Sequence, residues 1–235
     1  INKAIYYLTL AANQNHIFAQ YALGCIYTFR IADINKAIYY MTLAANKNFS
    51  IAQFYLGSIY EAGVYVIRDI KKAIYYYSKA ANENNIEAQI NLGCIYTNGK
   101  YVTKDINKAI YYFTLAANQN NPLAQLYLGK IYDTEENIRD IDKAIHYYSL
   151  AANQYQPEAL FILSRYYFFG KYVSQNISKA IHYCTLSAKL NNKDAQYLLG
   201  LVYISGAFFD KNIQYGLNFL VQSLENGLID AYFSL

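Results

Sequence analysis

Apolar residues recur along this chain at the three- and four-residue spacing of one helix face. Between Ile34 and Ala45 they stand at positions 34, 37, 38, 41, 44 and 45, which predicts an amphipathic helix. A second helix is predicted a few residues later, from the apolar face formed by Ala52, Leu56, Ile59 and Tyr60. The pattern therefore predicts short helices that pack in antiparallel pairs.

This pair of helices is repeated. Its first helix opens with I-N-K-A-I-Y-Y or a variant of it at Ile1, Ile34, Ile70, Ile106, Ile141, Ile177 and Ile213. The stretch from each start to the tyrosine of the second helix has one length in the first six repeats, whereas the stretch after that tyrosine varies. A fixed length indicates packed structure and a variable one a surface loop. We therefore expect one solenoid over residues 1–235, with repeats at 1–33, 34–69, 70–105, 106–140, 141–176, 177–212 and 213–235.

The first helix of each repeat has a start signal and a stop signal. Asp or Asn precedes it at Asp33, Asp69, Asp105, Asp140, Asn176 and Asn212, where the side chain can accept from free N–H groups. It ends in a turn at Asn15, Asn48, Asn84, Asn120, Tyr155, Asn191 and Gly227, and Asn and Gly tolerate left-handed backbone. At Tyr155 we expect a differently shaped turn, stiffened by Pro157. Pro122 and Pro157 suit the first position of the next helix.

Glycine recurs inside the second helix, at Gly24, Gly57, Gly93, Gly129 and Gly200, with Ser164 in the sixth case. A helical glycine costs about 1 kcal/mol relative to alanine, so its recurrence predicts that two backbones approach closely there. On the same helix, Leu56→Ala or Tyr60→Ala is expected to destabilise the protein by about 2 to 5 kcal/mol, as buried large-to-small changes do. We call the first helix of each repeat the KA helix and the second the LG helix.

The combined pattern is A-x-x-x-L-G-x-x-Y, a loop ending in Asp, then K-A-x-x-Y-[YFC]-x-x-A-A, over nearly the whole chain. It resembles the Sel-1-like repeat, a relative of the tetratricopeptide repeat. The resemblance implies an all-α fold, a right-handed α/α superhelical solenoid of about seven antiparallel hairpins with the last one incomplete, and a role as a protein-binding scaffold. The chain departs from the family pattern with Asn at the turn, with Ser164, and with Tyr215 and Gly216 in the eroded last repeat.

Composition and charge exclude some classes of protein. Apolar residues make up 55% of the chain, yet no run reaches the roughly 18 apolar residues that a membrane span needs, so no membrane insertion is expected. One lysine in each of the first six repeats stands three residues after a helix cap, at Lys36, Lys72, Lys108, Lys143 and Lys179, with Lys3 equivalent. This spacing predicts a local pair on the first turn, and with a net charge of only +4 no nucleic-acid partner is expected. Because the chain opens with Ile1 and stops before the seventh LG helix could finish, we expect it to be part of a longer protein.

No motif for catalysis, for a cofactor or for a metal is present. The chain contains no P-loop, G-x-S-x-G, H-E-x-x-H or C-x-x-C sequence, so we predict no catalytic residue and no cofactor. His146 and His182 replace a tyrosine of the repeat and His16 lies in a turn, which is a weak metal signal. Cys25, Cys94 and Cys184 lack the paired pattern of some secreted relatives, which favours a cytoplasmic location.

Positions that vary between repeats are candidates for recognition. By resemblance to tetratricopeptide arrays, the LG helices line a concave groove at three positions each: Tyr21, Cys25, Thr28; Phe54, Ser58, Glu61; Ile90, Cys94, Thr97; Leu126, Lys130, Asp133; Phe161, Arg165, Phe168; and Tyr197, Leu201, Ile204. The first of each set is large and apolar, which leaves open whether it belongs to the core or to the binding surface. The second and third mix charged, polar and apolar types, a mixture that core packing would not permit, and such a groove suits an extended peptide or a partner helix.

Arg165, with Phe161 and Phe168 in its set, is the strongest hot-spot candidate. Arg165→Ala and Phe168→Ala are expected to weaken partner binding without lowering the melting temperature by more than a few degrees. The sequence thus predicts a non-catalytic adaptor. One alternative is the interaction arm of a multidomain signalling enzyme such as a protein kinase, to which relatives of this family are fused. A second is a lumenal quality-control adaptor, to which N-x-[ST] sequons at Asn48 and Asn176 lend little support.

Overall fold

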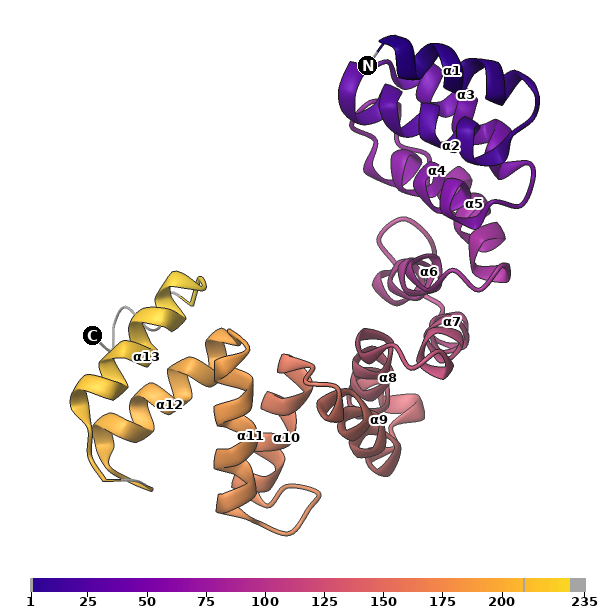
Figure 1. Ribbon diagram of the computed structural model, residues 1–235. Helices are drawn as coiled ribbons and strands as arrows, with labels where there is room; N and C mark the ends of the chain where they lie inside the picture. The colour runs from indigo at the N-terminus through magenta and orange to yellow at the C-terminus, as the bar shows by residue number, and fades with distance from the viewer. Residues whose placement is uncertain (1, 209, 229–235) are drawn as a thin grey trace. The chain divides into compact units, whose positions relative to one another are not determined.

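A computed structural model describes residues 2–208 and 210–228, and every regular element within them is helical (Figure 1). The chain divides into two compact units, residues 1–119 and residues 120–235. Both units are built from short antiparallel helices of the lengths that the apolar periodicity predicts. The predicted all-α solenoid of helical hairpins is therefore confirmed in its fold class.

In the N-terminal unit the KA helices are α1 (Asn2–Asn13), α3 (Ile34–Ala45), α5 (Ile70–Asn82) and α7 (Ile106–Asn118), and the LG helices are α2 (Ile17–Ile26), α4 (Ser50–Ala62) and α6 (Ile86–Asn98). In the C-terminal unit the LG helices are α8 (Pro122–Thr134), α10 (Pro157–Phe169) and α12 (Lys193–Ser205), and the KA helices are α9 (Ile141–Asn153), α11 (Ile177–Lys189) and α13 (Ile213–Glu225). A π-helical turn, Tyr27–Ile31, follows α2, and a 3-10 turn, Glu136–Ile138, follows α8.

The predicted helix starts and turns are confirmed, with one correction. Asp33 accepts a hydrogen bond from the Lys36 N–H at 3.1 Å, and the other five caps accept equivalent bonds. All seven turn residues have the predicted positive φ. The differently shaped turn expected at Tyr155 is wrong, because its φ of 58° matches that of the asparagines. The turn geometry is set by the hairpin, and the hairpin imposes it even on a residue that disfavours it.

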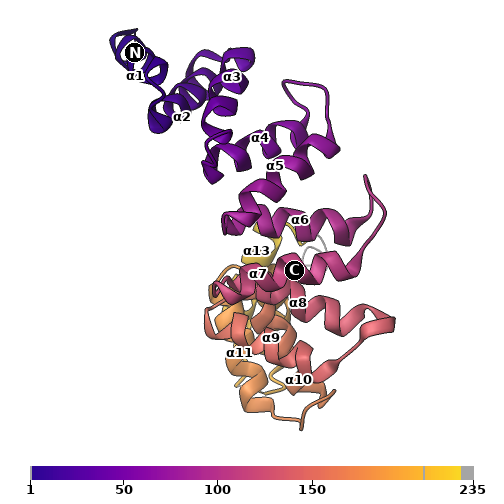
Figure 2. The same ribbon diagram turned by 90° about the vertical axis from the view of Figure 1, so that its right-hand side faces the viewer.

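Loops of different length are closed by the same backbone hydrogen bond, between equivalent positions of the repeat. The carbonyl oxygen of Tyr60 accepts from the Asp69 N–H at 3.0 Å across one loop, and that of Tyr27 accepts from the Asp33 N–H at 2.9 Å across a shorter one. The shorter loop achieves this through the π-helical turn and a left-handed residue, Ala32. In Figure 2 the loops after α4 and α6 project on the same side of the N-terminal unit. The hairpin geometry is thus independent of loop length.

The tyrosines that recur across the repeats stack in pairs between successive helices. The Tyr60 ring lies parallel to Tyr76 at 5.9 Å between centroids, and the Lys72 amine lies 5.0 Å from the Tyr60 centroid. Equivalent stacks join Tyr27 to Tyr40, Tyr96 to Tyr112, Tyr132 to Tyr147 and Tyr167 to Tyr183. The predicted pairing of lysine with its cap is confirmed for Lys36, Lys72, Lys108 and Lys143, at 3.1 to 3.9 Å. Each of these lysines is therefore engaged by both a carboxylate and a ring.

The core runs between the helices of each hairpin and between neighbouring hairpins. Ala37, Met41, Ala44 and Ala45 of α3 are buried, as the periodicity predicts, together with Leu56 of α4. Ile59 and Tyr60 are half-buried at the edge of this core. The full burial assumed for Tyr60 is therefore wrong, because one side of its ring is covered by a lysine rather than by apolar atoms.

The recurring glycine receives a large side chain from the next KA helix. A Cβ atom on Gly57 would lie 2.5 Å from the Tyr77 ring. The corresponding neighbours are Met41 for Gly24, Phe113 for Gly93, Tyr148 for Gly129 and Leu220 for Gly200. The closest atoms belong to a side chain in every case, so the predicted backbone contact is wrong as the main reason for glycine. Ser164 stands in this place opposite Cys184, a small residue with which it lines one small cavity.

Buried glutamines join the two helices of a repeat and then join neighbouring repeats, a feature that the sequence did not single out. Within a repeat, the side-chain amide donates to a carbonyl at the end of the preceding KA helix, for Gln20, Gln53, Gln89 and Gln196. The amide oxygen then accepts from the next repeat: Gln119 donates to Gln89, Gln154 to Gln125 and Asn226 to Gln196, at 2.8 to 2.9 Å. In one repeat Leu160 takes the place of the glutamine, and in the next repeat Leu190 takes the place of the residue that would donate to it.

Glu83 occupies the donor position opposite Gln53, and the buried Gln53 Oε1 has no hydrogen-bond partner in the described structure. Glu83→Gln is therefore expected to raise the free energy of unfolding by about 1 kcal/mol, because it supplies the missing donor. Gln119→Glu is expected to lower it by about 1 to 3 kcal/mol, because it leaves the Gln89 oxygen without its donor. Urea unfolding measures both changes.

Glu87→Gln, at an exposed glutamate of α6, is the control for the change in charge. If Glu83→Gln and Glu87→Gln alter stability equally, the change in charge explains the effect and the missing donor does not.

Candidate protein-binding surface

The predicted groove residues all lie on the LG helices or the turn after α2. The N-terminal unit carries Tyr21, Cys25, Thr28, Phe54, Ser58, Glu61, Ile90, Cys94 and Thr97, and the C-terminal unit carries Leu126, Lys130, Asp133, Phe161, Arg165, Phe168, Tyr197, Leu201 and Ile204. Seventeen of the eighteen retain exposed surface. Leu126 does not: it is 1% exposed within the core of the C-terminal unit. Leu126 therefore belongs to the core, one of the two alternatives left open for the first residue of each set.

Glu61 shows that variation at these positions can follow packing. The Tyr77 hydroxyl donates to the Glu61 carboxylate at 2.6 Å and lies 3.2 Å from the Ser58 hydroxyl. Burial raises the pKa of Tyr77 above its usual range, and the hydrogen bond to Glu61 raises it further. Glu61 thus satisfies a hydroxyl that the core buries, which is a structural role.

Asp133 lies near two tyrosines in the C-terminal unit. Burial raises the pKa of Tyr148, and the nearby Asp133 carboxylate raises it further. The same two causes raise the pKa of Tyr166. An acid thus occurs opposite a tyrosine hydroxyl, whereas Thr97 occurs opposite Phe113 and bonds back to the Gly93 carbonyl at 2.8 Å.

The expectation that core packing would not permit this mixture is therefore wrong for Glu61. Its role can be recognised by comparing repeats. The type of residue at the third groove position of an LG helix follows the type of the eighth residue of the next KA helix. That comparison needs the pairing of helices, which the sequence implies only once the fold is known.

The buried tyrosines predict a loss of stability at alkaline pH. Their pKa values are raised in the folded protein, so it keeps their protons above pH 10, whereas tyrosine in the unfolded chain loses them there. The free energy of unfolding is therefore expected to fall as pH rises above about 10, by up to about 1.4 kcal/mol per pH unit for each such tyrosine. Urea unfolding between pH 8 and 11 measures this slope. Tyr148→Phe is expected to reduce it, and the same substitution at the exposed Tyr39 is expected to leave it unchanged.

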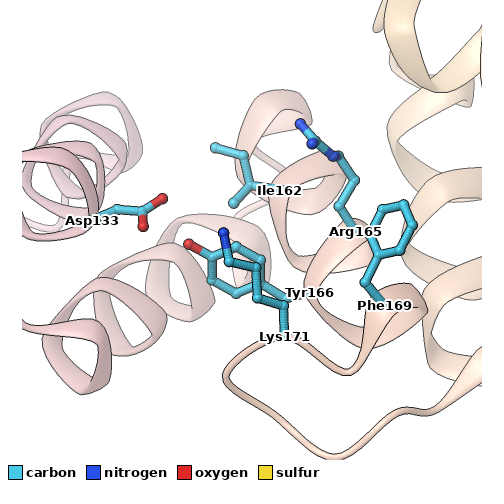
Figure 3. Close-up of a pocket in the computed structure, with 6 residues that line it drawn as sticks. All are labelled: Asp133, Ile162, Arg165, Tyr166, Phe169 and Lys171. Carbon is cyan, nitrogen blue, oxygen red and sulfur yellow. The ribbon is translucent and has the colours of Figure 1, made fainter.

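Arg165 lies at the most accessible part of the predicted surface. It is exposed on α10, and no ion pair to it occurs within the described residues. One side of it faces a hollow of about 180 Å³ that Asp133, Tyr166 and Lys171 also line (Figure 3). On the other side is a cleft of about 710 Å³, which Phe161 lines. The structure thus brings Arg165 and Phe161 together as predicted.

Phe168 has a different environment from Arg165. Its ring contacts Phe169 at 5.0 Å and Phe208 at 5.4 Å between centroids. It also lines the small apolar cavity beside Ser164 and Cys184. Because these contacts are packing contacts, Phe168→Ala is expected to lower stability, unlike the prediction from the sequence.

The predicted Lys130 is tied to the neighbouring LG helix. Its amine lies 2.6 Å from the Glu158 carboxylate of α10. Ile162, Lys171 and Glu158 are among the lining residues of this surface that were not predicted. Ile162 and Glu158 lie on α10 itself, one residue after Phe161 and three before it, so a helical projection of that helix could have found them. Lys171 lies in a loop, and only the folded chain brings it to Arg165.

Within the described residues, no helix is long and apolar enough to cross a membrane. In the same part of the chain, no three His, Cys, Asp or Glu side chains gather in a way that could hold a metal ion.

Comparison with known families defines the class of this fold. The Sel1 repeat matches residues 1–16, 17–49, 50–85, 86–121, 122–155, 157–192 and 193–228. The chain belongs to the Sel1 repeat family, whose fold is typically a non-catalytic scaffold for protein interactions. The family's repeat opens with the LG helix, whereas the boundaries predicted here open with the KA helix. No curated protein sequence matches the chain.

Solved structures of other Sel1 repeat proteins are similar. A Sel1 repeat protein from Oxalobacter formigenes is 30% identical over 85% of this chain and 82% of its own, with a TM-score of 0.78. The protective antigen c5321 of uropathogenic Escherichia coli is 26% identical over 98% of this chain and 58% of its own, with a TM-score of 0.62. The immunity protein Pa5087 of Pseudomonas aeruginosa, at 22% identity and a TM-score of 0.53, shares the fold.

Proposed function

We propose that this chain is a non-catalytic adaptor that binds an extended segment of a partner protein along its LG helices. The observation that carries the proposal is Arg165, an exposed arginine without an ion pair in the described structure, between two hollows lined with apolar groups. Arginine and aromatic side chains supply most of the binding energy in many protein interfaces. Polar, charged and apolar groups also alternate along this face, as in other peptide grooves.

Site-specific cross-linking in cells that make the protein tests the location of the partner. A photoreactive amino acid at Ser58 or Leu201 places the probe on LG helices, and one at Tyr75 or Tyr111 places it on exposed positions of KA helices. Partner proteins are expected to be cross-linked from the LG positions. Cross-links from the KA positions alone would contradict the proposal.

Arg165→Ala is expected to weaken binding of a cross-linked partner by about 10-fold or more, since a central arginine is a typical hot spot. The melting temperature is expected to change by no more than a few degrees, because the side chain is exposed. Binding assays with the purified partner measure the first effect, and thermal unfolding measures the second. Loss of folding in this variant would show that Arg165 has a structural role instead.

A further inference from the structure

The side chains of Ile162 and Arg165 form a ridge on α10 that separates the two hollows described above. Both residues line the 180 Å³ hollow, and both line the 710 Å³ cleft. In Figure 3, Ile162 and Arg165 extend from α10 above the Tyr166 ring, and the Lys171 amine points into the same hollow as the Asp133 carboxylate. A ligand that crosses the ridge would therefore contact Arg165 and apolar groups on both sides.

Each acidic group around this ridge has a cationic or polar neighbour, whereas no ion pair to Arg165 occurs within the described residues. Glu158 pairs with Lys130 at 2.6 Å. Asp133 lies near the hydroxyls of Tyr148 and Tyr166. Asp194 lies in the first turn of α12, where the helix dipole favours a negative charge. The unmatched charge on the ridge is therefore positive, and it is complementary to a carboxylate.

The cleft also offers hydrogen-bond donors. The Gln156 Oε1 atom accepts from the Ala159 N–H at 2.8 Å, and the Asn192 Oδ1 atom accepts from the Ala195 N–H at 2.9 Å. These bonds fix each amide with its oxygen toward the helix. The NH₂ group of each amide makes no hydrogen bond within the described part of the chain, so both are available to the carbonyl oxygens of an extended peptide.

We propose that the Ile162–Arg165 ridge binds an extended peptide segment through an acidic side chain paired with Arg165 and a large apolar neighbour packed against Phe161 and Ile162. This inference rests on the proposed function and specifies the chemistry of the partner. Arginine favours a carboxylate because its planar guanidinium can donate two parallel hydrogen bonds. The acid belongs to the interior of the segment rather than to a chain end, because hollows lie on both sides of the ridge and a chain end would fill one side.

Selection from a random peptide library tests this specificity. The probe is a library of 12-residue peptides displayed on phage and joined to the coat protein by their C-terminal ends, so that no free terminal carboxylate is offered. Peptides that bind the full 235-residue chain are expected to be enriched in Asp or Glu beside a large apolar residue. Selection on Arg165→Ala is expected to lose this enrichment, and selection on Arg30→Ala, at an exposed arginine of the N-terminal unit, is expected to keep it.

A synthetic peptide with the selected consensus then gives the strength of the pair. Its version with Asn or Gln in place of the acid is expected to bind the wild-type chain at least about 10-fold more weakly, the loss typical of a charge-assisted contact. Arg165→Ala is expected to bind both versions equally. Arg165→Lys is expected to restore part of the difference, because it keeps the charge and loses the two parallel bonds.

The outcomes separate this inference from the proposed function. If the selected peptides lack acidic enrichment but lose binding with Phe161→Ala, the groove binds peptides and the acidic specificity is wrong. If the acidic preference persists in Arg165→Ala, another cation recognises the carboxylate and the inference is wrong. If neither the wild type nor any variant selects peptides, the inference and the proposed function fail together.

Discussion

Leu56→Ala is expected to lower the free energy of unfolding by about 2 to 5 kcal/mol. The Leu56 side chain has no exposed surface and packs with Met41, Ala44, Ala45 and Ala52, so it joins the KA and LG helices of one repeat. Truncation removes buried apolar contacts and leaves a cavity that the two helices can close only in part. Three of the four other buried residues in this cluster are alanines, whose short side chains cannot move to fill the space.

Urea unfolding followed by circular dichroism measures this change. Ile51→Ala, on the same helix at a position 41% exposed, is the matched control, and its effect is expected to stay within about 1 kcal/mol. Equal effects of the two substitutions would contradict the assignment of the buried face of α4. Tyr60→Ala is expected to have a smaller effect than Leu56→Ala, because Tyr60 is half-buried.

Cys184→Leu is expected to destabilise the protein by about 1 to 3 kcal/mol, and Ser164→Gly in the same chain is expected to recover most of that loss. Cys184 occupies the position at which other repeats place a large side chain against glycine. At the equivalent pair, a Cβ atom on Gly200 would lie 2.6 Å from the Leu220 side chain. Leucine at position 184 would meet the Cβ atom of Ser164 in the same way, and such overpacking strains both helices.

Four proteins form the test: the wild type, each single variant and the double variant. The interaction free energy of the double-mutant cycle is expected to favour the pair by about 1 kcal/mol or more, because the two residues are in contact. The reverse exchange at the equivalent pair is the control. Gly200→Ser is expected to destabilise the chain, and adding Leu220→Cys is expected to remove that effect. Additive effects of Ser164→Gly and Cys184→Leu would contradict the proposed exchange of volume.

Cys184 also illustrates how burial alters chemistry at this position. Desolvation raises the pKa of its thiol to about 12. The thiol therefore stays protonated at neutral pH and behaves as a small apolar group. Its role in the sixth repeat is to match the volume of Ser164.

For the candidate site, the resemblance to tetratricopeptide arrays placed Arg165 and Phe161 in one set, and the structure brings the two residues together because their spacing puts them on one face of α10. The sequence left open whether Leu126 belongs to the core, and it misread Glu61. A variable position looks the same in a sequence whether it faces a partner or satisfies a buried group of the next repeat. Lys171 reaches the site through a loop whose path the periodicity does not encode.

The sequence by itself determined the helices, their caps, the left-handed turns and the stacking of repeats, since each depends on residues within one repeat or on its period. Only the tertiary structure decided what each recurring residue packs against. The glycines accept a side chain from the next KA helix, the glutamines join neighbouring repeats, and one acid of the expected groove, Glu61, satisfies a tyrosine hydroxyl. These contacts join residues about 15 to 30 positions apart, and their geometry depends on how two hairpins pack, which local periodicity does not specify.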